Sequence, residues 1–485
     1  MRKPLIFSAM ATSVTAAAVL LTGIWPAEAQ IAGGYDFTRP QTVATGLVAP
    51  WGMAFLPDGS LLVTERDSAR LLQIRTGQGP QVLGTIPGVV PGGEGGLLGI
   101  AVSPTFASDQ WVYVYFTAAN DNRITRFRLN AIGTQQVILS GLAKATIHDG
   151  GRIAFGPDGM LYAGVGDAGN TANAQNQNSL NGKILRMTPT GGVPAGNPFN
   201  TLVYSLGHRN VQGLAWDAQN RLFATEFGQN TFDEVNMIVA GGNYGWPTCE
   251  GICSNPAFRN PIVTWTTAEA SPSGAAIANG HFFAAALRGQ RLWVVPLTAS
   301  GGAGTPVDEL NNQFGRLRAV VRGPDGWLWI ATSNRDGRGT PTAQDDRIVR
   351  FPPEGTQPSP SMSASPSRPP SPSVSPSQNP SPQPGGCTAT YQVVNSWPGN
   401  FQANVTVRNT GTTATTGWTV TWAFPNGQVI SQLWGGLFQQ NGANVTVRNE
   451  TWNGVIPPNG TTSFGFIASA PGANGVPNPV ACARS

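Results

Sequence analysis

The segment Phe155-Gly-Pro-Asp-Gly-Met-Leu-Tyr-Ala-Gly164 combines a Pro-Asp-Gly turn with an alternating apolar strand. Closely similar copies begin at Phe55 and Arg322, and weaker ones begin at Val102, Trp216 and Leu292. The copies recur about every fifty residues, and repeats of that length built from a turn and short strands are typical of β-propeller blades. Roughly 320 residues at that spacing give six units, so we predict an all-β fold, a six-bladed β-propeller. Helical patterns are weak throughout, which disfavours a doubly wound α/β fold as the alternative.

A Pro/Ser-rich segment, residues 353–386, separates this part of the chain from its C-terminal region. The segment contains repeated Pro-Ser units and almost no apolar side chains, so it cannot bury a core and is expected to be an extended tether. In polyproline geometry such a tether reaches up to about 100 Å. We therefore predict a propeller over residues 30–352, a linker over 353–386 and a compact module over 387–485.

The N-terminus is typical of a secretory signal peptide. Arg2 and Lys3 precede an apolar run, and the small-residue pattern Ala27-Glu-Ala29 follows it, which predicts cleavage before Gln30. We expect residues 1–29 to be removed and the mature protein to be secreted to the cell exterior. A retained membrane anchor is the alternative, but Ser and Thr interrupt the run and its length is marginal for a span. No later segment is apolar enough to cross a membrane.

The charges of the chain are few and spread thinly. Only 11% of its residues are charged, and the formal net charge is +4. No run of Lys and Arg resembles the basic clusters that contact nucleic acids or anionic membranes. We therefore expect no nucleic-acid partner.

The four cysteines form two groups, Cys249 with Cys253 and Cys387 with Cys482. An oxidising exterior favours disulfides, and the division into domains leaves one of the three possible pairings, Cys249 to Cys253 and Cys387 to Cys482. A metal site at Cys249 and Cys253 is the alternative, although no His or further Cys lies close by in the sequence. The motif Cys-x-x-Cys-His is absent, so covalent haem is excluded.

Three groups of polar residues have the chemistry of a catalytic site. His148 precedes a Gly-Gly turn and has a side chain suited to removing a proton at neutral pH. Arg209 offers a fork of donors for carboxylates or an oxyanion, and Asn210 offers both a donor and an acceptor. Arg316 and Arg318 lie on one face of a predicted strand, where two guanidinium groups repel unless an anion lies between them. Together these residues indicate a polyanionic organic ligand, and a structural histidine with solvated arginines is the alternative.

A further segment is rich in oxygen ligands. It contains the carboxylates of Glu226, Asp233 and Glu234, a glycine turn at Gly228 and a Tyr-Gly-Trp-Pro corner after Asn243. Carboxylate and carbonyl oxygens are the ligands that calcium prefers, although the segment lacks the regular ladder of an EF-hand loop. Ordinary loop capping is the alternative interpretation.

Five motifs within residues 36–352 occur in the same order in one enzyme family. They are Pro50-Trp-Gly-Met-Ala-Phe, Glu94-Gly-Gly-Leu-Leu-Gly, His148-x-Gly-Gly-Arg, Gly207-His-Arg-Asn and Asn243-Tyr-Gly-Trp-Pro. With these motifs the chain resembles the soluble quinoprotein glucose/sorbosone dehydrogenases. That family consists of six-bladed propellers that use pyrroloquinoline quinone (PQQ) and calcium to oxidise aldoses.

The resemblance implies roles for the polar residues. His148 is the base that takes the proton of the sugar's C1 hydroxyl while hydride passes to the C5 carbon of the quinone. Arg209 steadies the charge that develops on the quinone oxygen. Asn210, Arg316 and Arg318 hold the carboxylates and ring carbonyls of the cofactor.

The resemblance also implies two calcium sites. The main-chain carbonyls of Gly228 and Gln229 match the ligands of the cofactor's calcium ion. Glu234 and Tyr244 match a second, structural calcium site.

Several positions depart from the family pattern. Arg288 stands where relatives often carry a cofactor-binding Lys, and Gln229 replaces a Pro seen in some members. Glu94 stands in the cofactor site where relatives have Gln, and Ile147 precedes the catalytic His where glucose-specific members place Asp. The sequence therefore leaves the sugar substrate open.

The C-terminal region, from Cys387 to Cys482, alternates strongly between apolar and polar residues. This pattern predicts an immunoglobulin-like β-sandwich whose ends are joined by a disulfide. Trp418, Val420 and Trp422 fall on one strand face and are expected in the core.

Three other tryptophans of this region, Trp397, Trp434 and Trp452, lie beside Pro, Gly or Asn, as expected of exposed positions. Exposed indoles form an apolar patch that needs a partner, and flat rings can stack on the C–H faces of sugar rings. The region resembles the bacterial family-two modules that bind crystalline cellulose. Burial of all five tryptophans in the core is the alternative.

The expected function is that of a secreted, cellulose-anchored PQQ sugar dehydrogenase, monomeric, which passes its electrons to a separate acceptor. A sugar-binding propeller with a decayed redox site is the rival hypothesis, motivated by Arg288 and Glu94. A glycosidase is a weaker one, because the carboxylates of Asp167 and Glu226 show no spacing recognisable for hydrolysis.

Overall fold

The computed structural model describes residues 31–355, 386–397, 399–450, 453–470, 474–477 and 479–484. The chain divides into two compact units, residues 1–356 and 357–485. The predicted signal peptide and nearly all of the predicted linker lie outside the described residues. Strands dominate both units, and the only helices in the described ranges are α1 (Phe106–Asp109), α2 (Ala172–Gln175) and a 3₁₀ turn at Pro198–Asn200. The all-β prediction is confirmed, and no helix described here is long and apolar enough to span a bilayer.

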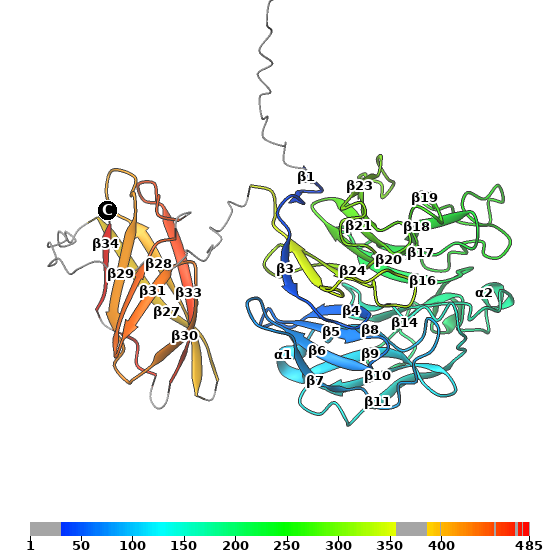
Figure 1. The fold of residues 1–485 in the computed structure, drawn as a ribbon, viewed down its shortest axis with the longest axis horizontal. Helices are drawn as coiled ribbons and strands as arrows, with labels where there is room; N and C mark the ends of the chain where they lie inside the picture. The colour runs from blue at the N-terminus through cyan, green and yellow to red at the C-terminus, as the bar shows by residue number, and fades with distance from the viewer. Residues whose placement is uncertain are drawn as a thin grey trace, which may run out of the picture. The chain divides into compact units, whose positions relative to one another are not determined.

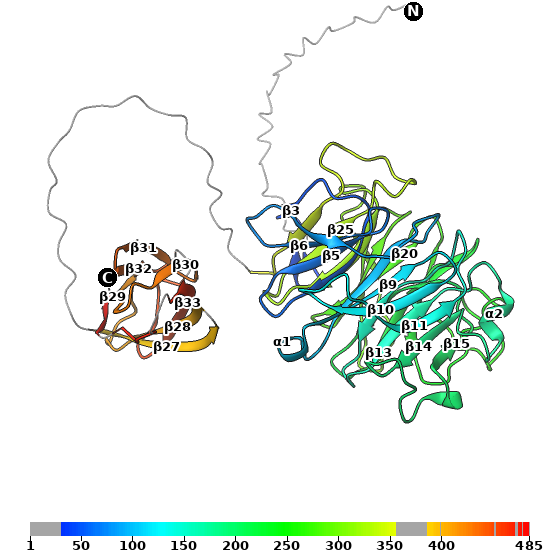
Figure 2. The same ribbon diagram turned by 90° about the horizontal axis from the view of Figure 1, so that it is seen from below.

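The N-terminal unit consists of six four-stranded antiparallel sheets and a short pair of strands. Five sheets are formed by strands that follow one another in the sequence, and Figure 2 shows β9, β10 and β11 of one sheet next to β13, β14 and β15 of the following one. These strands are β4 (Pro50–Phe55), β5 (Leu61–Glu65), β6 (Arg70–Ile74), β7 (Gln81–Thr85); β8 (Leu97–Val102), β9 (Trp111–Thr117), β10 (Asn122–Arg128), β11 (Gln136–Leu142); β12 (Ile153–Phe155), β13 (Leu161–Val165), β14 (Lys183–Met187), β15 (Val203–Leu206); β16 (Val211–Trp216), β17 (Leu222–Glu226), β18 (Phe232–Ile238), β19 (Val263–Thr266); and β20 (Pro272–Ala278), β21 (His281–Ala286), β22 (Arg291–Pro296), β23 (Val307–Glu309).

The sixth sheet joins the two ends of this unit. It contains β24 (Leu317–Arg322), β25 (Leu328–Thr332), β26 (Ile348–Phe351) and, from the N-terminal end, β3 (Gln41–Ala44). Figure 1 shows the blue strand β3 beside the yellow-green strands of this sheet. The short pair β1 (Ile31–Ala32) and β2 (Tyr35–Asp36) lies nearby, and Asp36 N donates a hydrogen bond to Pro352 O at 3.0 Å.

The Pro-Asp-Gly repeats form the turns between the first and second strands of their sheets. In each turn the aspartate side chain accepts a hydrogen bond from the main-chain N–H two residues later, at 2.9 Å for Asp58 and 3.1 Å for Asp158 and Asp325. The glycine of each turn has φ between +74° and +82°, a conformation that favours glycine. The sequence repeat therefore marks an equivalent place in three sheets.

The first strands of the six sheets gather around a common interior. Strand β4 contacts β8, β8 contacts β12, β16 contacts β20, β20 contacts β24, and β24 contacts β4. Residues from all six of these strands line one cavity of about 290 Å³. Apolar side chains of neighbouring sheets share buried clusters, and one of these clusters contains Trp51, Leu98 and Tyr115. The loops that enter these first strands are therefore brought to one end of the unit.

The C-terminal unit consists of two four-stranded antiparallel sheets with a shared apolar core. One sheet contains β27 (Cys387–Trp397), β28 (Asn400–Asn409), β33 (Thr461–Ser469) and β30 (Val429–Trp434), and the other β31 (Leu437–Asn441), β32 (Asn444–Arg448), β29 (Trp418–Ala423) and β34 (Val480–Arg484). Trp418, Val420 and Trp422 are buried in the core, as predicted. The side chains of Trp397, Trp434 and Trp452 lie outside the described residues, so their exposure stays a prediction.

Both predicted disulfides are present. Cys249 pairs with Cys253 and Cys387 pairs with Cys482, with Cα atoms 5.9 and 5.7 Å apart. The pairing of Cys249 with Cys253 excludes the alternative of a metal site at these two thiols. The second disulfide joins the first strand of the C-terminal unit to its last.

Candidate active site

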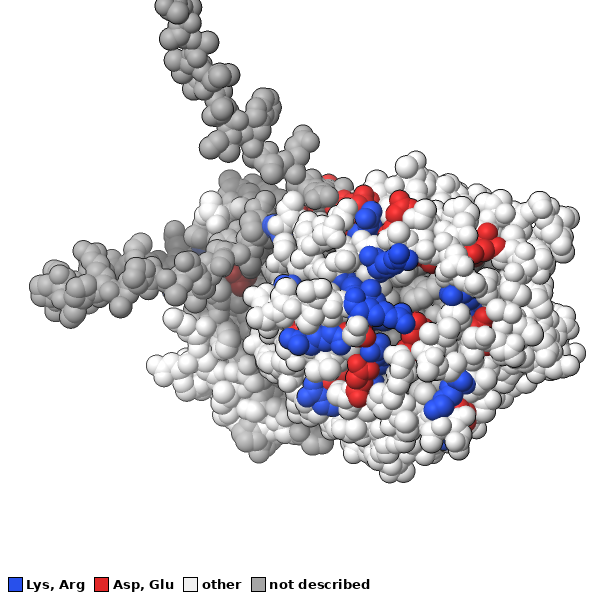
Figure 3. All heavy atoms as spheres, turned by 45° about the vertical axis from the view of Figure 1, so that its right-hand side comes forward, with Lys and Arg blue, Asp and Glu red and all other residues white. Residues whose placement is uncertain are grey.

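The predicted polar residues meet at the starts of the first strands. Glu94 precedes β8, His148 precedes β12, Asn210 precedes β16 and Arg316 precedes β24. Hydrogen bonds join three of these loops: Glu94 Oε2 accepts from His148 N at 2.9 Å, and Asn210 Oδ1 accepts from Gly150 N at 3.1 Å. Lys and Arg side chains gather around a hollow on one face of the N-terminal unit (Figure 3).

His148 is held by a buried carboxylate. Its Nδ1 lies 2.7 Å from Asp167 Oδ1, and the other oxygen of Asp167 accepts from Trp246 Nε1 at 2.9 Å. Burial opposes the ionisation of Asp167, but the hydrogen bonds from His148 and Trp246 outweigh it and lower the pKa of this carboxyl. An ionised Asp167 accepts a proton-bearing Nδ1, which leaves the lone pair on Nε2 of His148. No group among the described residues bonds to Nε2, so this atom is free to act as a base.

Arg209 and Asn210 present donors without acceptors. Arg209 N donates to Glu226 Oε1, and Arg209 Nη1 donates to Phe227 O at 3.1 Å. The Arg209 guanidinium lies 5.5 Å from the centre of the Trp246 ring. Arg209 Nε and Asn210 Nδ2 are buried and have no partner in the described part of the chain. Because an unpaired buried donor is costly, this pair calls for acceptor oxygens from a ligand.

Arg316 and Arg318 share one carboxylate. Arg316 donates to Asp336 Oδ2 through Nε at 3.0 Å and Nη2 at 2.9 Å, and Arg318 Nη2 lies 3.6 Å from the same oxygen. Arg318 Nη1 also donates to Gln212 Oε1 at 2.7 Å, whereas its buried Nε has no partner in residues 31–355. Burial lowers the pKa of Arg318 to about 9, so the group stays charged at neutral pH. The anion expected between the two guanidinium groups is thus in part the carboxylate of Asp336, which no sequence motif indicated.

Two other predicted residues lie at the same end of the unit. Both oxygens of Glu94 are used, one by His148 N and the other by Arg338 Nη1 at 3.0 Å, so Glu94 positions the loop of the base. Arg288 lies in the turn between β21 and β22 and is exposed. It makes no hydrogen bond or ion pair with the residues that the structure describes, and its contact with a cofactor stays a prediction.

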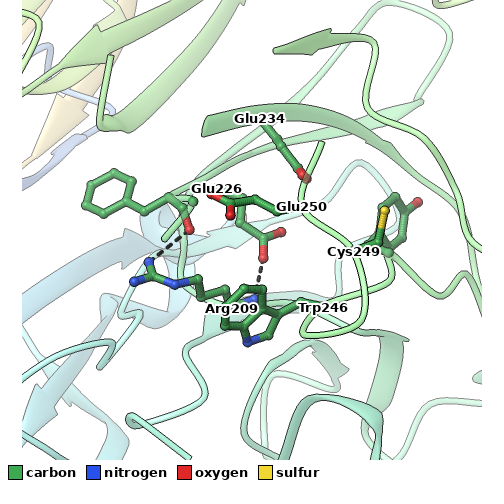
Figure 4. Close-up of a pocket in the computed structure, with 9 residues that line it drawn as sticks. Arg209, Glu226, Glu234, Trp246, Cys249 and Glu250 are labelled. Carbon is green, nitrogen blue, oxygen red and sulfur yellow. Dashed lines mark hydrogen bonds between the residues drawn. The ribbon is translucent and has the colours of Figure 1, made fainter. Parts of the chain in front are cut away.

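The predicted calcium residues lie on and beside β17 and β18. Three carboxylates, those of Glu226, Glu234 and Glu250, line a cavity of about 10 Å³, large enough for a single water molecule or cation (Figure 4). Glu234 Oε1 accepts from Gly251 N at 2.7 Å. Burial and the nearby charge of Glu226 raise the pKa of Glu234 well above its ordinary value. A cation in this cavity would relieve that unfavourable burial of negative charge.

The main-chain carbonyls of Gly228 and Gln229 accept no hydrogen bond from the described residues. The hydroxyl of Tyr244 donates to Met237 O at 2.7 Å and accepts from Val239 N at 3.0 Å, so the Tyr244 carbonyl is the more available metal ligand of this residue. No three His, Cys, Asp or Glu side chains of the described ranges are arranged as a metal cluster. A calcium ion at Gly228 and Gln229 would therefore depend on main-chain carbonyl oxygens, which suit this cation.

Comparison with known proteins agrees with the two units. Residues 47–343 match the family model described as Glucose / Sorbosone dehydrogenase, and residues 387–483 match that of the Cellulose binding domain. The solved structure of the PQQ-bound aldose sugar dehydrogenase of Streptomyces coelicolor is 53% identical in sequence and superposes with a TM-score of 0.63. The match covers 64% of this chain and 96% of the Streptomyces chain.

Two further relatives match by sequence. An uncharacterised Synechocystis protein is 34% identical over 351 residues, which are 61% of this chain and 84% of the relative. Endoglucanase A of Thermobispora bispora is 58% identical over 86 residues, 18% of this chain and 19% of the relative. The chain therefore belongs to the glucose/sorbosone dehydrogenase family and carries a cellulose-binding domain at its C-terminal end.

Proposed function

We propose that this protein oxidises the C1 hydroxyl of an aldose or oligosaccharide to a lactone, with PQQ as cofactor. The observation that carries this proposal is the free Nε2 of His148, backed by Asp167, at the same end of the unit as the unpaired donors of Arg209 and Asn210. We further propose that the six sheets are the blades of a six-bladed propeller, with this site at one end of its axis. The PQQ-bound relative from Streptomyces coelicolor supports the choice of cofactor.

The residues present fit an anionic quinone. Arg209 Nε and Asn210 Nδ2 would donate to its ring oxygens, and the guanidiniums of Arg316 and Arg318 would pair with its carboxylates. When bound, the quinone supplies the acceptor for the hydride that leaves the sugar's C1. His148 Nε2 would hold the proton of the C1 hydroxyl, and ionised Asp167 would stabilise the imidazolium that results. Arg288 and Glu94 would border the same site.

We also propose two calcium sites. The carbonyls of Gly228 and Gln229 would bind the ion next to the cofactor. Glu234 and the Tyr244 carbonyl would bind a second ion in the acidic cavity. Both sets consist of oxygen ligands, as calcium requires.

Calcium binding at the acidic cavity should weaken as the pH falls. The pKa of Glu234 is raised in the metal-free protein, so at lower pH a cation must displace the proton of this carboxyl. We expect apparent calcium affinity, measured by calorimetry between pH 8.5 and pH 6, to fall steadily and protons to be released on binding. An affinity that rises as the pH is lowered would contradict the assignment of Glu234.

The C-terminal domain would hold the enzyme on its polysaccharide. We propose that the signal peptide directs secretion, that residues 353–386 are the tether, and that the indoles of Trp397, Trp434 and Trp452 stack on cellulose. The protein would act as a monomer without a membrane or nucleic-acid partner, and with no haem motif its electrons would pass to a separate acceptor.

Replacing Trp397, Trp434 and Trp452 together with alanine should abolish retention on microcrystalline cellulose and leave sugar oxidation intact. The reason is that flat indoles supply the contact area with an uncharged surface. A pull-down with cellulose measures the effect. The triple variant keeps Trp418, whose side chain is buried in the core, so the fluorescence of this tryptophan reports whether the domain is still folded. Retention equal to that of the wild type would contradict the stacking model.

The enzymatic proposal is tested by reconstitution. The purified apoprotein is incubated with PQQ and calcium, and dye reduction is measured with glucose, cellobiose, sorbosone and rarer aldoses. We expect turnover with at least one of these sugars and none with His148→Gln. Binding of a sugar without dye reduction would overturn the proposal in favour of a sugar-binding propeller with a decayed redox site.

A further inference from the structure

A five-residue loop closed by the Cys249–Cys253 disulfide contacts both of the proposed calcium sites. We call residues 249–253 the disulfide loop and residues 228–232 the carbonyl loop. Glu250 Oε1 accepts four hydrogen bonds from the carbonyl loop, from the N–H groups of residues 229, 230, 231 and 232 at 2.8, 3.1, 2.9 and 3.0 Å. In Figure 4 the Glu250 carboxylate reaches into the cavity that Gly228 also lines.

These bonds determine where the carbonyls of the carbonyl loop point. In a trans peptide the N–H and the C=O of one unit point in opposite directions. The peptide bonds of this loop are trans, since the cis bonds of the described chain lie at Trp246–Pro247 and Asp345–Asp346. The N–H groups of residues 229 and 230 face Glu250, so the carbonyls of Gly228 and Gln229 face away from it. Those two carbonyls accept no hydrogen bond from the described residues and are available to a cation.

The disulfide loop also holds the second proposed site. Gly251 N donates to Glu234 Oε1 at 2.7 Å, so adjacent residues of one short loop contact the two sites. The loop packs closely against the carbonyl loop: a Cβ on Gly251 would lie 2.7 Å from the ring of Phe232, and φ of this glycine is +79°. Cys249 and Cys253 flank these two residues and fix their backbone.

We propose that Glu250, fixed by the Cys249–Cys253 disulfide, is the positioning residue for the calcium-binding carbonyls of Gly228 and Gln229. The carboxylate gathers four N–H groups on one side of the loop and thereby presents the carbonyls on the other side. This inference rests on the proposed function, because it assigns the occupant of the carbonyls as calcium. Reduction of the disulfide would loosen both sites together.

The test compares Glu250→Gln and the double variant Cys249→Ser/Cys253→Ser with the wild type. Amide hydrogen exchange of residues 229–232 is measured in the cofactor-free protein, and calcium affinity is measured by calorimetry with and without PQQ. The amide of Gln is a neutral acceptor and forms weaker bonds than a carboxylate. We expect protection of these amides to fall at least about tenfold and calcium affinity to weaken by about tenfold or more.

Two matched controls isolate the effect. Glu269→Gln removes another capping carboxylate, which accepts only from Thr266 and does not contact the carbonyl loop. Cys387→Ser/Cys482→Ser removes the disulfide of the other unit. Both controls should leave amide exchange at residues 229–232 and calcium affinity at wild-type values. Glu250→Asp, which keeps the charge on a shorter side chain, should lie between Glu250→Gln and the wild type and serves if Glu250→Gln fails to fold.

Unchanged amide protection in Glu250→Gln would overturn the inference, as would wild-type calcium affinity in a variant that has lost the protection. The failure of the proposed function has a different signature. A wild type that binds neither calcium nor PQQ would overturn that function, while the hydrogen exchange would still report whether Glu250 orders the loop.

Discussion

Replacing Asp167 with asparagine is expected to lower the kcat of the reconstituted enzyme by about three orders of magnitude, with PQQ affinity nearly unchanged. The carboxylate accepts three hydrogen bonds, from His148 Nδ1, Gly169 N and Trp246 Nε1. The amide of asparagine has one oxygen and one NH₂ group, so its NH₂ must face at least one of these donors. If it faces His148, the proton of the imidazole moves to Nε2, the atom that has to accept the proton of the sugar. In either orientation the negative charge that stabilises the imidazolium is lost.

Stopped-flow reduction of the bound quinone measures this effect directly, because it isolates the step in which the proton is removed. Asp308→Asn is the matched control, since Asp308 is a more exposed aspartate that pairs with Arg291. The control should keep wild-type kcat. A kcat within about threefold of the wild type in Asp167→Asn would show that Asp167 does not support the base.

Removing the Cys387–Cys482 disulfide is the change with the largest expected effect on stability. The bond spans 95 residues and joins strands β27 and β34 at the two ends of the C-terminal unit. Closing a loop of this length stabilises a fold by roughly 4 to 5 kcal/mol through the entropy of the unfolded chain. A domain of about 100 residues has only about 5 to 15 kcal/mol of stability in total, so most of its margin depends on this bond. We expect Cys387→Ser/Cys482→Ser to release the protein from cellulose at a much lower urea concentration than the wild type.

The variant Cys249→Ser/Cys253→Ser is the control that distinguishes the loss of the Cys387–Cys482 bond from the loss of a disulfide in general. Its bond has a sequence separation of 4, for which the same entropy argument gives only about 2 kcal/mol. This bond also lies in the N-terminal unit, so its loss should leave the urea profile of cellulose retention at that of the wild type. Equal profiles for both double variants would contradict the assigned role of the Cys387–Cys482 bond.

The fold was readable from the sequence because its turns are local. The Asp of each Pro-Asp-Gly repeat bonds to an N–H two residues away, so the signal that marks the turn and the bond that forms it lie in the same short segment. The strand β3 shows the limit of such reasoning. It pairs with β26, some three hundred residues later, and no local pattern of residues 41–44 announces that partner.

The candidate site was predicted in its residue types and only partly in its contacts. His148, Arg209, Asn210 and Arg318 were identified because their groups have obvious chemistry. Asp167 was not predicted as the partner of His148, although the pairing of β12 with β13 could have indicated it. Ile153 pairs with Ala163, so the residues just before β12 and just after β13 lie side by side, and these include His148 and Asp167. Asp336 and Glu250 could not be found in this way. Each bonds to residues of a different loop, and no strand pairing or motif in the sequence shows that the two loops lie together.

The sheet that joins the two ends of the N-terminal unit would also receive any pull transmitted from the cellulose-binding domain. The chain leaves this unit just after β26, which lies between β25 and β3 and bonds to both. Glu354 N donates to Gly34 O at 2.9 Å, so the exit point is tied directly to the N-terminal segment. If residues 353–386 act as the proposed tether, a pull along them would enter β26, a strand paired on both sides, and not an edge strand. That sheet is separate from the one whose first two strands are flanked by His148 and Asp167, so the proposed base would lie outside the loaded sheet.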